Sequence, residues 1–322
     1  MEYVKIRDTS ILVSKMALGT WVFSKDANWG DQDDQDSIKT LHMALDAGIT
    51  LIDTATAYGA GKSEEIVGEG LKDRRSKAII ATKVADGHPD KATVISACEA
   101  SLKRLQTDYI DIYQIHWPRR TVDFSDTMEG LLSLYKSGKI RAIGVSNFGV
   151  EDLEEMSKYG PIHTNQIAYN PLFRAIDHEI RDACIKKDIG ILNYSALAQG
   201  LCTGKYSNID EIPERLKRVW YLSPEYKHLH KPIFETLDCI KKLAKQEGLN
   251  MAALSIAYGM HKPQTASVLV GARNTDQLKE NLKAANLKLE ADIMDKMDKC
   301  TNELFNLMKY NADMWRTESA IR

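Results

Sequence analysis

The stretch that decides the fold runs from residue 109 to residue 146, and its three parts are YIDIYQIH (Tyr109–His116), TMEGLLSLYK (Thr127–Lys136) and IRAIGVS (Ile140–Ser146). The outer two are short apolar runs rich in β-branched residues, as is typical of buried strands. The middle part repeats apolar residues at helical spacing, and Gly138 follows it where a helix would end. A strand, a helix and a second strand in this order predict two parallel neighbours, because parallel strands need a crossover connection.

The same alternation extends in both directions along the chain. Strand-like runs occupy Lys15–Gly19, Thr50–Asp53, Ala78–Lys83, Tyr109–His116, Ile140–Ser146, His163–Gln166, Gly190–Ser195 and Ser267–Gly271. Every gap between them carries a helical pattern. Eight such units in 322 residues predict an α/β fold, a closed (β/α)8 TIM barrel. A doubly wound open sheet competes with this fold, but it calls for a Gly-rich turn after the first strand, and that turn is missing from the sequence.

Two segments lie outside the repeated pattern. Tyr3–Val13 contains two short apolar runs around Asp8, Thr9 and Ser10, which predict a β-hairpin. The longest segment without strand character runs from Thr203 to about Lys231, and a loop this long in a barrel is usually functional or disordered. Because no linker or low-complexity tract interrupts the chain, we expect residues 1–322 to form a single domain.

Composition excludes several classes of protein. The net charge is -2 and no basic block is present, so we expect no nucleic-acid partner. No run of 18 apolar residues exists and the N-terminus lacks a signal-peptide core, so we expect a cytoplasmic protein without a membrane partner. The five cysteines are dispersed, which predicts reduced thiols and no disulfide. His228 and His230 have no metal-ligating neighbours at suitable spacing, so we expect no metal site.

Polar residues stand where most of the predicted strands end. These residues are Asp53, Lys83, His116, Ser146, Asn147, Gln166, Ser195 and Arg273. Barrel enzymes place their active sites at the C-terminal ends of the strands, because the loops there vary without disturbing the core. The pattern therefore predicts an active site at this end of the barrel.

Four residues make a coherent acid–base set. Tyr58 is a poor acid near neutral pH by itself, and a nearby ammonium such as that of Lys83 would lower the pKa of its phenol. Asp53 would hold that ammonium in place, and His116 would polarise a carbonyl oxygen. Each residue alone has a structural explanation, as a helix cap, a rim charge, a core histidine or a loop aromatic. The four together favour catalysis.

The motifs LIDTATAYG (Leu51–Gly59), ATK ending at Lys83, SLKRLQTDYIDIYQIHWP (Ser101–Pro118) and KIRAIGVSNF (Lys139–Phe148) resemble the aldo-keto reductase superfamily. The similarity is greatest to its bacterial general-reductase branch and to potassium-channel β-subunit-like proteins, and it extends from about Val4 to Asn286. The resemblance implies a barrel whose bottom is sealed by the N-terminal hairpin. It also implies a catalytic tetrad of Asp53, Tyr58, Lys83 and His116.

The cofactor that the resemblance implies is NADPH/NADP+. Its nicotinamide end would contact Gly19, Thr20, Trp21 and Asp53, its carboxamide would be held by Ser146, Asn147 and Gln166, and its ring would stack on Tyr194. The pyrophosphate would lie against Ser195, Ala196, Leu197, Ala198 and Lys205. The adenosine 2′-phosphate and the adenine would be bound by Gly271, Arg273, Gln277, Glu280 and Asn281. Arg273 has independent physical support, because it precedes a predicted helix N-terminus and a guanidinium pairs well with phosphate. Ser195-Ala196 departs from the family, which often has a proline after the stacking aromatic.

The function expected from these residues is NADPH-dependent reduction of an aldehyde or ketone, sugars included, in a pocket formed by Trp21, Tyr58, His116 and Trp117. A slowly turning NADP-binding regulatory subunit and an alcohol or sugar dehydrogenase remain open as alternatives. The partner is a small carbonyl compound whose identity depends on the loops Trp21–Asp36, Arg119–Phe124 and Thr203–Lys231 and on the tail Tyr310–Arg322. The tail Tyr310–Arg322 has no interpretable pattern, and the sequence does not indicate an oligomeric state.

Overall fold

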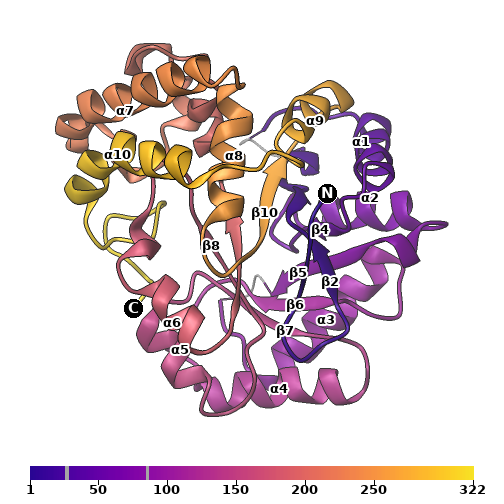
Figure 1. Cartoon of the computed structure of the whole chain (residues 1–322). Coiled ribbons are helices and arrows are strands. Elements are labelled where there is room, and N and C mark those ends of the chain that lie inside the picture. The colour runs from indigo at the N-terminus through magenta and orange to yellow at the C-terminus, as the bar shows by residue number, and fades with distance from the viewer. Residues whose placement is uncertain (26–28, 85–86) are drawn as a thin grey trace.

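The computed structural model describes residues 1–25, 29–84 and 87–322, and eight parallel strands close into a barrel at its centre (Figure 1). The strands are β3 (Met16–Gly19), β4 (Leu51–Asp53), β5 (Ile79–Val84), β6 (Ile112–Ile115), β7 (Ile143–Ser146), β8 (Thr164–Ala168), β9 (Gly190–Tyr194) and β10 (Thr265–Gly271). They follow one another in chain order, and β10 pairs with β3 to complete the circle. This closure confirms the predicted (β/α)8 barrel, because an open sheet would leave two unpaired edges.

Helices surround the barrel (Figure 1). They are α1 (Asp34–Asp46), α2 (Lys62–Leu71), α3 (Lys91–Leu105), α4 (Phe124–Lys136), α5 (Val150–Met156), α6 (Ile180–Lys186), α7 (Lys227–Gln246), α8 (Met251–His261), α9 (Thr275–Leu282) and α10 (Ala291–Met308). Most are amphipathic and bury one face, whereas α8 is buried over nearly its whole length. Within the described ranges, no helix is long and apolar enough to cross a membrane.

Local sequence signals explain where the helices begin and end. The side chains of Asp33, Asp90 and Asn274 accept hydrogen bonds from backbone N–H groups in the first turns of α1, α3 and α9. Gly48 and Gly138 follow α1 and α4 with φ of 87° and 75°, a left-handed conformation that glycine adopts without a Cβ clash. These caps set the length of each crossover helix. Because all the strands are parallel, their C-terminal ends lie at the same rim of the barrel.

The N-terminal hairpin consists of β1 (Tyr3–Lys5) and β2 (Leu12–Ser14), which pair antiparallel as predicted. Val13 is fully buried in an apolar cluster with Leu51 and Ile112, the first residues of β4 and β6. The hairpin thus covers the N-terminal ends of the strands. This end of the barrel is closed, so a ligand can reach the interior only from the opposite end.

The predicted long loop, residues 203–231, is built from short 3-10 helices at Ile209–Glu211, Glu214–Leu216, Trp220–Leu222 and Pro224–Tyr226. Its last residues already belong to α7, which starts at Lys227. A second loop expected to shape the pocket spans residues 21–36, and its residues 26–28 lie outside the described part of the chain.

The expectation that all cysteines are reduced is wrong for one pair. Cys239 of α7 and Cys300 of α10 form a disulfide, with their Cα atoms 5.6 Å apart. The two helices lie side by side (Figure 1) although the cysteines are separated by 61 residues. Nothing in the sequence spacing reports this contact, because it depends on how two helices pack outside the barrel. Cys98, Cys184 and Cys202 are free and buried, as expected.

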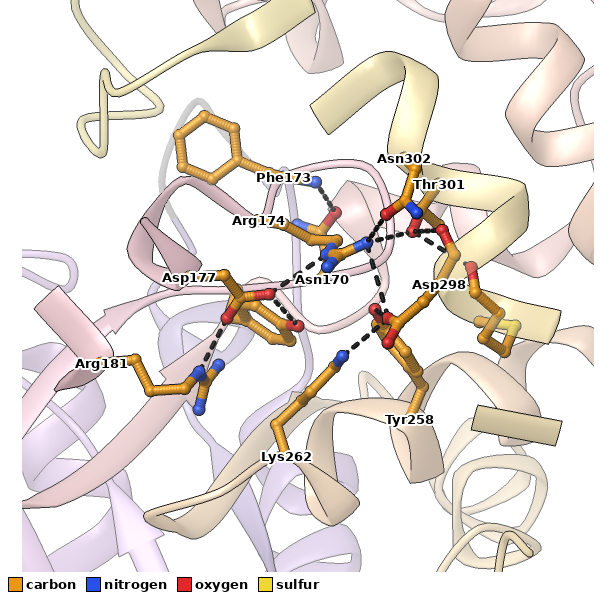
Figure 2. Close-up of polar contacts among 12 residues, drawn as sticks. Asn170, Phe173, Arg174, Asp177, Arg181, Tyr258, Lys262, Asp298, Thr301 and Asn302 are labelled. Carbon is orange, nitrogen blue, oxygen red and sulfur yellow. Dashed lines mark hydrogen bonds and ion pairs between the residues drawn. The ribbon is translucent and has the colours of Figure 1, made fainter. Parts of the chain in front are cut away.

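Figure 2 shows how Arg174, in the segment after β8, attaches α10 to the barrel. The guanidinium donates to Thr301 Oγ1 at 2.6 Å and to Asn302 Oδ1 at 3.1 Å. Lys262, immediately after α8, pairs with Asp298 of α10 at 2.7 Å. Because Arg174 and Thr301 are buried, this network fixes the position of α10 and of the chain that leaves its C-terminal end.

Candidate active site

A cavity of about 1020 Å³ opens at the C-terminal ends of the barrel strands. Its wall includes Gly19, Asp53, Ser146, Tyr194 and Gly271, which are the last residues of β3, β4, β7, β9 and β10. The pocket therefore lies at the end of the barrel where the sequence predicts the active site.

Most of the predicted site residues line this one cavity. The lining contains Gly19, Trp21, Asp53, Tyr58, His116, Trp117, Ser146, Asn147, Gln166, Tyr194, Ser195, Ala196, Leu197, Lys205, Gly271, Arg273, Gln277, Glu280 and Asn281. Three predicted residues do not line it, namely Thr20, Lys83 and Ala198. They are buried in the layer behind the wall. Thr20 donates from its hydroxyl to the backbone oxygen of Asp53 at 2.9 Å, so its contact with the site is indirect.

Lys83 organises the centre of the site from behind the wall. Its side chain is 0% exposed, and its ammonium donates to Asp53 Oδ1 at 2.7 Å, to the backbone oxygen of Thr54 at 2.9 Å and to the Tyr58 hydroxyl at 3.2 Å. These contacts use all three protons of the ammonium. The second oxygen of Asp53 accepts from Gln166 Nε2 at 2.7 Å. The predicted set of Asp53, Tyr58 and Lys83 is therefore one connected hydrogen-bond network.

Burial opposes ionisation of the Lys83–Asp53 pair, and mutual contact favours it. Burial raises the pKa of the Asp53 carboxyl and lowers that of the Lys83 ammonium, while each charge counteracts the shift of its partner. Three donor contacts on Lys83 and two acceptor contacts on Asp53 satisfy the ionised forms. We therefore treat the pair as a buried ion pair.

The pKa of Tyr58 moves in the direction opposite to the one expected from its neighbours. Burial of the phenol raises this pKa well above 10, and the Asp53 carboxylate raises it further. The expectation that Lys83 acidifies the phenol is wrong in its net sign, because enclosure of the hydroxyl outweighs the ammonium beside it. The phenol is consequently protonated at neutral pH and available as a proton donor.

His116 lies on the other side of Tyr58, with ring centroids 6.3 Å apart and the rings nearly perpendicular. Burial, reinforced by the positive charges of Lys83 and Arg119, lowers the pKa of His116 to about 3. The imidazole is thus neutral and carries one N–H donor. Trp21 stacks on the ring of Tyr58, with 5.6 Å between centroids and 17° between planes.

The predicted nicotinamide wall is held together by its own hydrogen bonds. Ser146 donates from its hydroxyl to the backbone oxygen of Gln166 at 2.9 Å. Asn147 Nδ2 donates to the backbone oxygen of His116 at 3.0 Å, and the hydroxyl of Tyr194 donates to Asn147 Oδ1 at 2.9 Å. Asn147 has φ of 61°, a left-handed conformation that is uncommon for residues other than glycine. Such strain at a pocket wall is typical of functional sites.

The predicted phosphate-binding loop has an unusual backbone. Ser195, Ala198, Gln199 and Gly200 all have positive φ, of 56°, 46°, 55° and 99°. Both polar atoms of the Gln199 side-chain amide are buried without a hydrogen-bond partner among the described residues, although this side chain lines the cavity. An unsatisfied buried amide is costly, so this wall suits a polar ligand that supplies the missing partners. Lys205 adds a positive charge nearby.

The opposite end of the cavity contains the residues predicted for the adenosine. Arg273 precedes α9 and donates from Nε to Gln32 Oε1 at 3.1 Å, while its backbone N–H donates to Gln277 Oε1 at 2.9 Å. Asn281 donates from Nδ2 to the backbone oxygen of Gly271 at 3.2 Å. The backbone of Arg273 is therefore held by Gln277 of α9, and its guanidinium is held by Gln32 and the backbone oxygen of Asp31, both in the loop before α1. Gln32 was not among the predicted residues.

Sequence reasoning missed several residues of the wall. The cavity is also lined by Trp29, Gln199, Arg215, Trp315 and Arg316, none of which was singled out from the sequence. All of them except Gln199 lie in the loops and the tail that were expected to determine the substrate. One signal was present: the chain has only five tryptophans, and Trp21, Trp29, Trp117 and Trp315 all line this pocket. Tryptophan is too large to be common on an ordinary loop, so its clustering in loops marks a binding wall.

Comparison with known proteins agrees with the geometry. The chain is 40% identical over 290 residues to the aldo-keto reductase YhdN of Bacillus subtilis, covering 86% of this chain and 87% of that protein. It is 32% identical to the NADH-specific methylglyoxal reductase of Escherichia coli, over 92% and 98% of the two chains. It is also 29% identical to a probable voltage-gated potassium channel subunit beta of Arabidopsis thaliana, over 92% and 96%.

Solved structures give the same result. The glycerol dehydrogenase of Gluconobacter oxydans superimposes with a TM-score of 0.84 at 31% identity, over 94% of this chain and 95% of that one. An aldo-keto reductase of Klebsiella pneumoniae in complex with NADPH superimposes with a TM-score of 0.74 at 26% identity, over 94% and 96%. Residues 15–302 match the model of the Aldo/keto reductase family. The chain therefore belongs to the aldo/keto reductase family of oxidoreductases.

Proposed function

We propose that this protein reduces an aldehyde or ketone to an alcohol with NADPH, that residues 1–322 act as a single domain, and that Tyr58 is the proton donor. One observation carries the proposal. Tyr58 lines the cavity, and its hydroxyl is 3.2 Å from the Lys83 ammonium, which Asp53 holds at 2.7 Å. A phenol backed by a buried ammonium can release a proton and leave a stabilised phenolate.

When bound, a reduced nicotinamide supplies the hydride that adds to the carbonyl carbon. The residues of this chain handle the oxygen. Tyr58 gives its proton to the oxygen as negative charge develops there, and the resulting phenolate accepts a hydrogen bond from Lys83. His116, neutral because burial lowers its pKa to about 3, donates its N–H to the same oxygen. Trp21 covers Tyr58 and keeps water from the developing charge.

The residues along the cavity fit a nicotinamide dinucleotide. Tyr194 offers an aromatic face, Gln199 in the loop after it offers an unsatisfied side-chain amide, and Lys205 offers a positive charge. Arg273 at the far end suits a 2′-phosphate, which only NADPH carries. The Klebsiella pneumoniae structure with NADPH supports this choice, whereas the name of the Escherichia coli relative points to NADH. Cofactor preference is therefore a direct test of Arg273.

The central experiment is Tyr58→Phe, with 4-nitrobenzaldehyde as a general aldehyde probe. The phenol acts only on the developing alkoxide, so its loss should lower kcat by about a hundred- to ten-thousandfold. Cofactor affinity should be unchanged, as measured by quenching of tryptophan fluorescence with NADPH. Substantial kcat in a folded Tyr58→Phe variant would assign the proton donor to another residue, with His116 first.

Two comparisons favour other uses of the same site. The likeness to the glycerol dehydrogenase supports alcohol oxidation with NADP+, and the potassium-channel relative supports a regulatory subunit that turns over slowly. Comparing the rates of aldehyde reduction and glycerol oxidation at pH 7 distinguishes a reductase from an alcohol dehydrogenase, and a faster oxidation would favour the dehydrogenase. A turnover far below one per second with every aldehyde and ketose tested would favour the second.

A further inference from the structure

The C-terminal tail, residues 309–322, forms part of the pocket although its sequence shows no regular pattern. It begins where α10 ends, at Lys309, whose φ of 57° turns the chain away from the helix axis. Trp315 and Arg316 both line the cavity, and the Arg316 guanidinium lies 5.4 Å from the ring of Trp117. The tail therefore returns from the outer helices to the active-site end of the barrel.

The turn that presents Trp315 is held from both sides. The indole of Trp220 donates to the backbone oxygen of Asp313 at 2.9 Å, and the backbone N–H of Trp220 donates to the backbone oxygen of Met314 at 3.3 Å. The buried carboxylate of Asp313 accepts from the backbone N–H of Trp315 at 2.9 Å. Because α10 is itself fixed by the Arg174 network (Figure 2), the tail has a fixed base as well as a fixed turn.

A chain of three hydrogen bonds leads from Trp315 to the centre of the site. Trp315 Nε1–H donates to the hydroxyl of Tyr194 at 3.1 Å. That hydroxyl donates to Asn147 Oδ1 at 2.9 Å, and Asn147 Nδ2 donates to the backbone oxygen of His116 at 3.0 Å. The single proton of the Tyr194 phenol is used for Asn147, so the orientation of this hydroxyl is set by both neighbours.

We infer that Trp315 is a positioning residue, which fixes the Tyr194 ring for the nicotinamide through its indole N–H. The inference rests on the proposed function, in which the nicotinamide lies against Tyr194. The same indole packs edge-on against Trp21, with centroids 5.8 Å apart, and Trp21 stacks on Tyr58. One residue of the tail thus touches both the cofactor wall and the ring that covers the proton donor.

If Trp315 only fills space, the effect of replacing it should not depend on whether the Tyr194 hydroxyl is present. In that case the indole matters only as an apolar surface beside Trp21 and would act independently of the Tyr194 hydroxyl. Trp315→Phe separates the two roles, because phenylalanine keeps an aromatic ring in the wall and lacks the N–H. Tyr194→Phe keeps the stacking ring and removes the hydroxyl that receives this hydrogen bond.

The test is a double-mutant cycle of Trp315→Phe and Tyr194→Phe, with the dissociation constant of NADPH and kcat as two separate readouts. A hydrogen bond between uncharged groups corresponds to about a two- to tenfold change in each. We expect Trp315→Phe to cause this loss in the wild-type background and to have no further effect in the Tyr194→Phe background, since the acceptor is already absent.

Trp117→Phe is the matched control, because it removes an indole N–H from the same cavity without belonging to the chain of hydrogen bonds. Its effects should add to those of Tyr194→Phe. The positioning role would be overturned if the effects of Trp315→Phe and Tyr194→Phe were additive, or if Trp315→Phe had no effect. It would also be overturned if Trp117→Phe and Tyr194→Phe were non-additive to the same extent. Wild-type protein that binds neither NADPH nor NADH would overturn the proposed function and this inference with it.

Discussion

Replacing Lys83 with methionine tests whether the buried ammonium is the electrostatic centre of the site. Methionine keeps much of the stem length and apolar volume and loses the charge. Three hydrogen bonds disappear together, to Asp53, to the backbone of Thr54 and to the Tyr58 hydroxyl. The barrel wall is otherwise unchanged, so the effects can be traced to these contacts.

The stability cost follows from the carboxylate that is left behind. The Asp53 side chain is 3% exposed, and in the variant it keeps the hydrogen bond from Gln166 without a counter-charge. Removing one partner of a buried ion pair typically costs about 3–5 kcal/mol. The double variant Asp53→Asn/Lys83→Met removes both charges and should recover most of that loss. Both variants should retain only residual activity, because Tyr58 loses the ammonium that supports its acid–base role, and such a role contributes about a hundred- to ten-thousandfold to kcat.

The pH dependence of stability gives an independent signature. Without Lys83, burial of Asp53 is opposed mainly by the hydrogen bond from Gln166, so the pKa of its carboxyl in the folded variant lies above the value in the unfolded chain. The folded state then binds the proton more tightly, and the deficit of Lys83→Met relative to wild type should shrink as the pH falls toward 5. The double variant should show no such recovery.

Urea unfolding of the three proteins at pH 5 and pH 8 measures these stabilities, and NADPH absorbance follows reduction of 4-nitrobenzaldehyde. In the oxidation direction Tyr58 must act as a base, so loss of the Lys83 contact should move the alkaline limb of the profile to higher pH. Near-normal activity of Lys83→Met with an unmoved pH profile would refute the catalytic tetrad. A destabilisation that the double variant does not relieve would refute the argument from the unpaired carboxylate.

Three further predictions concern other parts of the molecule. Arg273→Ala should remove most of a ten- to hundredfold preference for NADPH over NADH, worth about 1.5–3 kcal/mol, and titration of both cofactors shows whether wild type has that preference. Because burial lowers the pKa of His116 to about 3, this imidazole takes up a proton at higher pH in the unfolded chain than in the folded one. Between pH 6.5 and pH 4 the free energy of unfolding of wild type should therefore fall by about 3 kcal/mol more than that of His116→Gln. Reduction of the Cys239–Cys300 disulfide, which spans 61 residues, should lower the free energy of unfolding by about 4 kcal/mol. It should also raise the number of titratable thiols in denaturant from three to five, and five thiols before reduction would contradict the disulfide.

The barrel could be predicted from sequence because its signals are local. Each strand is a short apolar run, and the crossover helices carry their own apolar period and, in several cases, a capping residue or a glycine after the last turn, as in the stretch from Tyr109 to Ser146. The position of the site follows from the fold, since parallel strands deliver their last residues to one rim. Asp53 and Ser146 could therefore be assigned to the cavity wall from their place at strand ends alone.

The missed features depend on contacts between segments distant in sequence. Cys239 and Cys300 meet because two outer helices pack together, and Trp315 reaches the pocket because Trp220 and Asp313 hold a turn without regular periodicity. Gln32 supports Arg273 across the rim from a loop on the other side of α9. None of these relations leaves a repeat or a motif that could be read from one sequence.

The pKa of Tyr58 was mispredicted for a related reason. Its neighbours are visible in the sequence, and Lys83 alone would lower this pKa, but the extent of burial is a property of the assembled wall. Trp21 and the surrounding loops enclose the phenol, so the cost of an isolated phenolate exceeds the help from the ammonium. In the proposed mechanism, Tyr58 would therefore keep its proton until an oxygen of developing negative charge lies within reach. Lys83, whose ammonium already donates to Asp53, Thr54 and Tyr58, would then stabilise the phenolate.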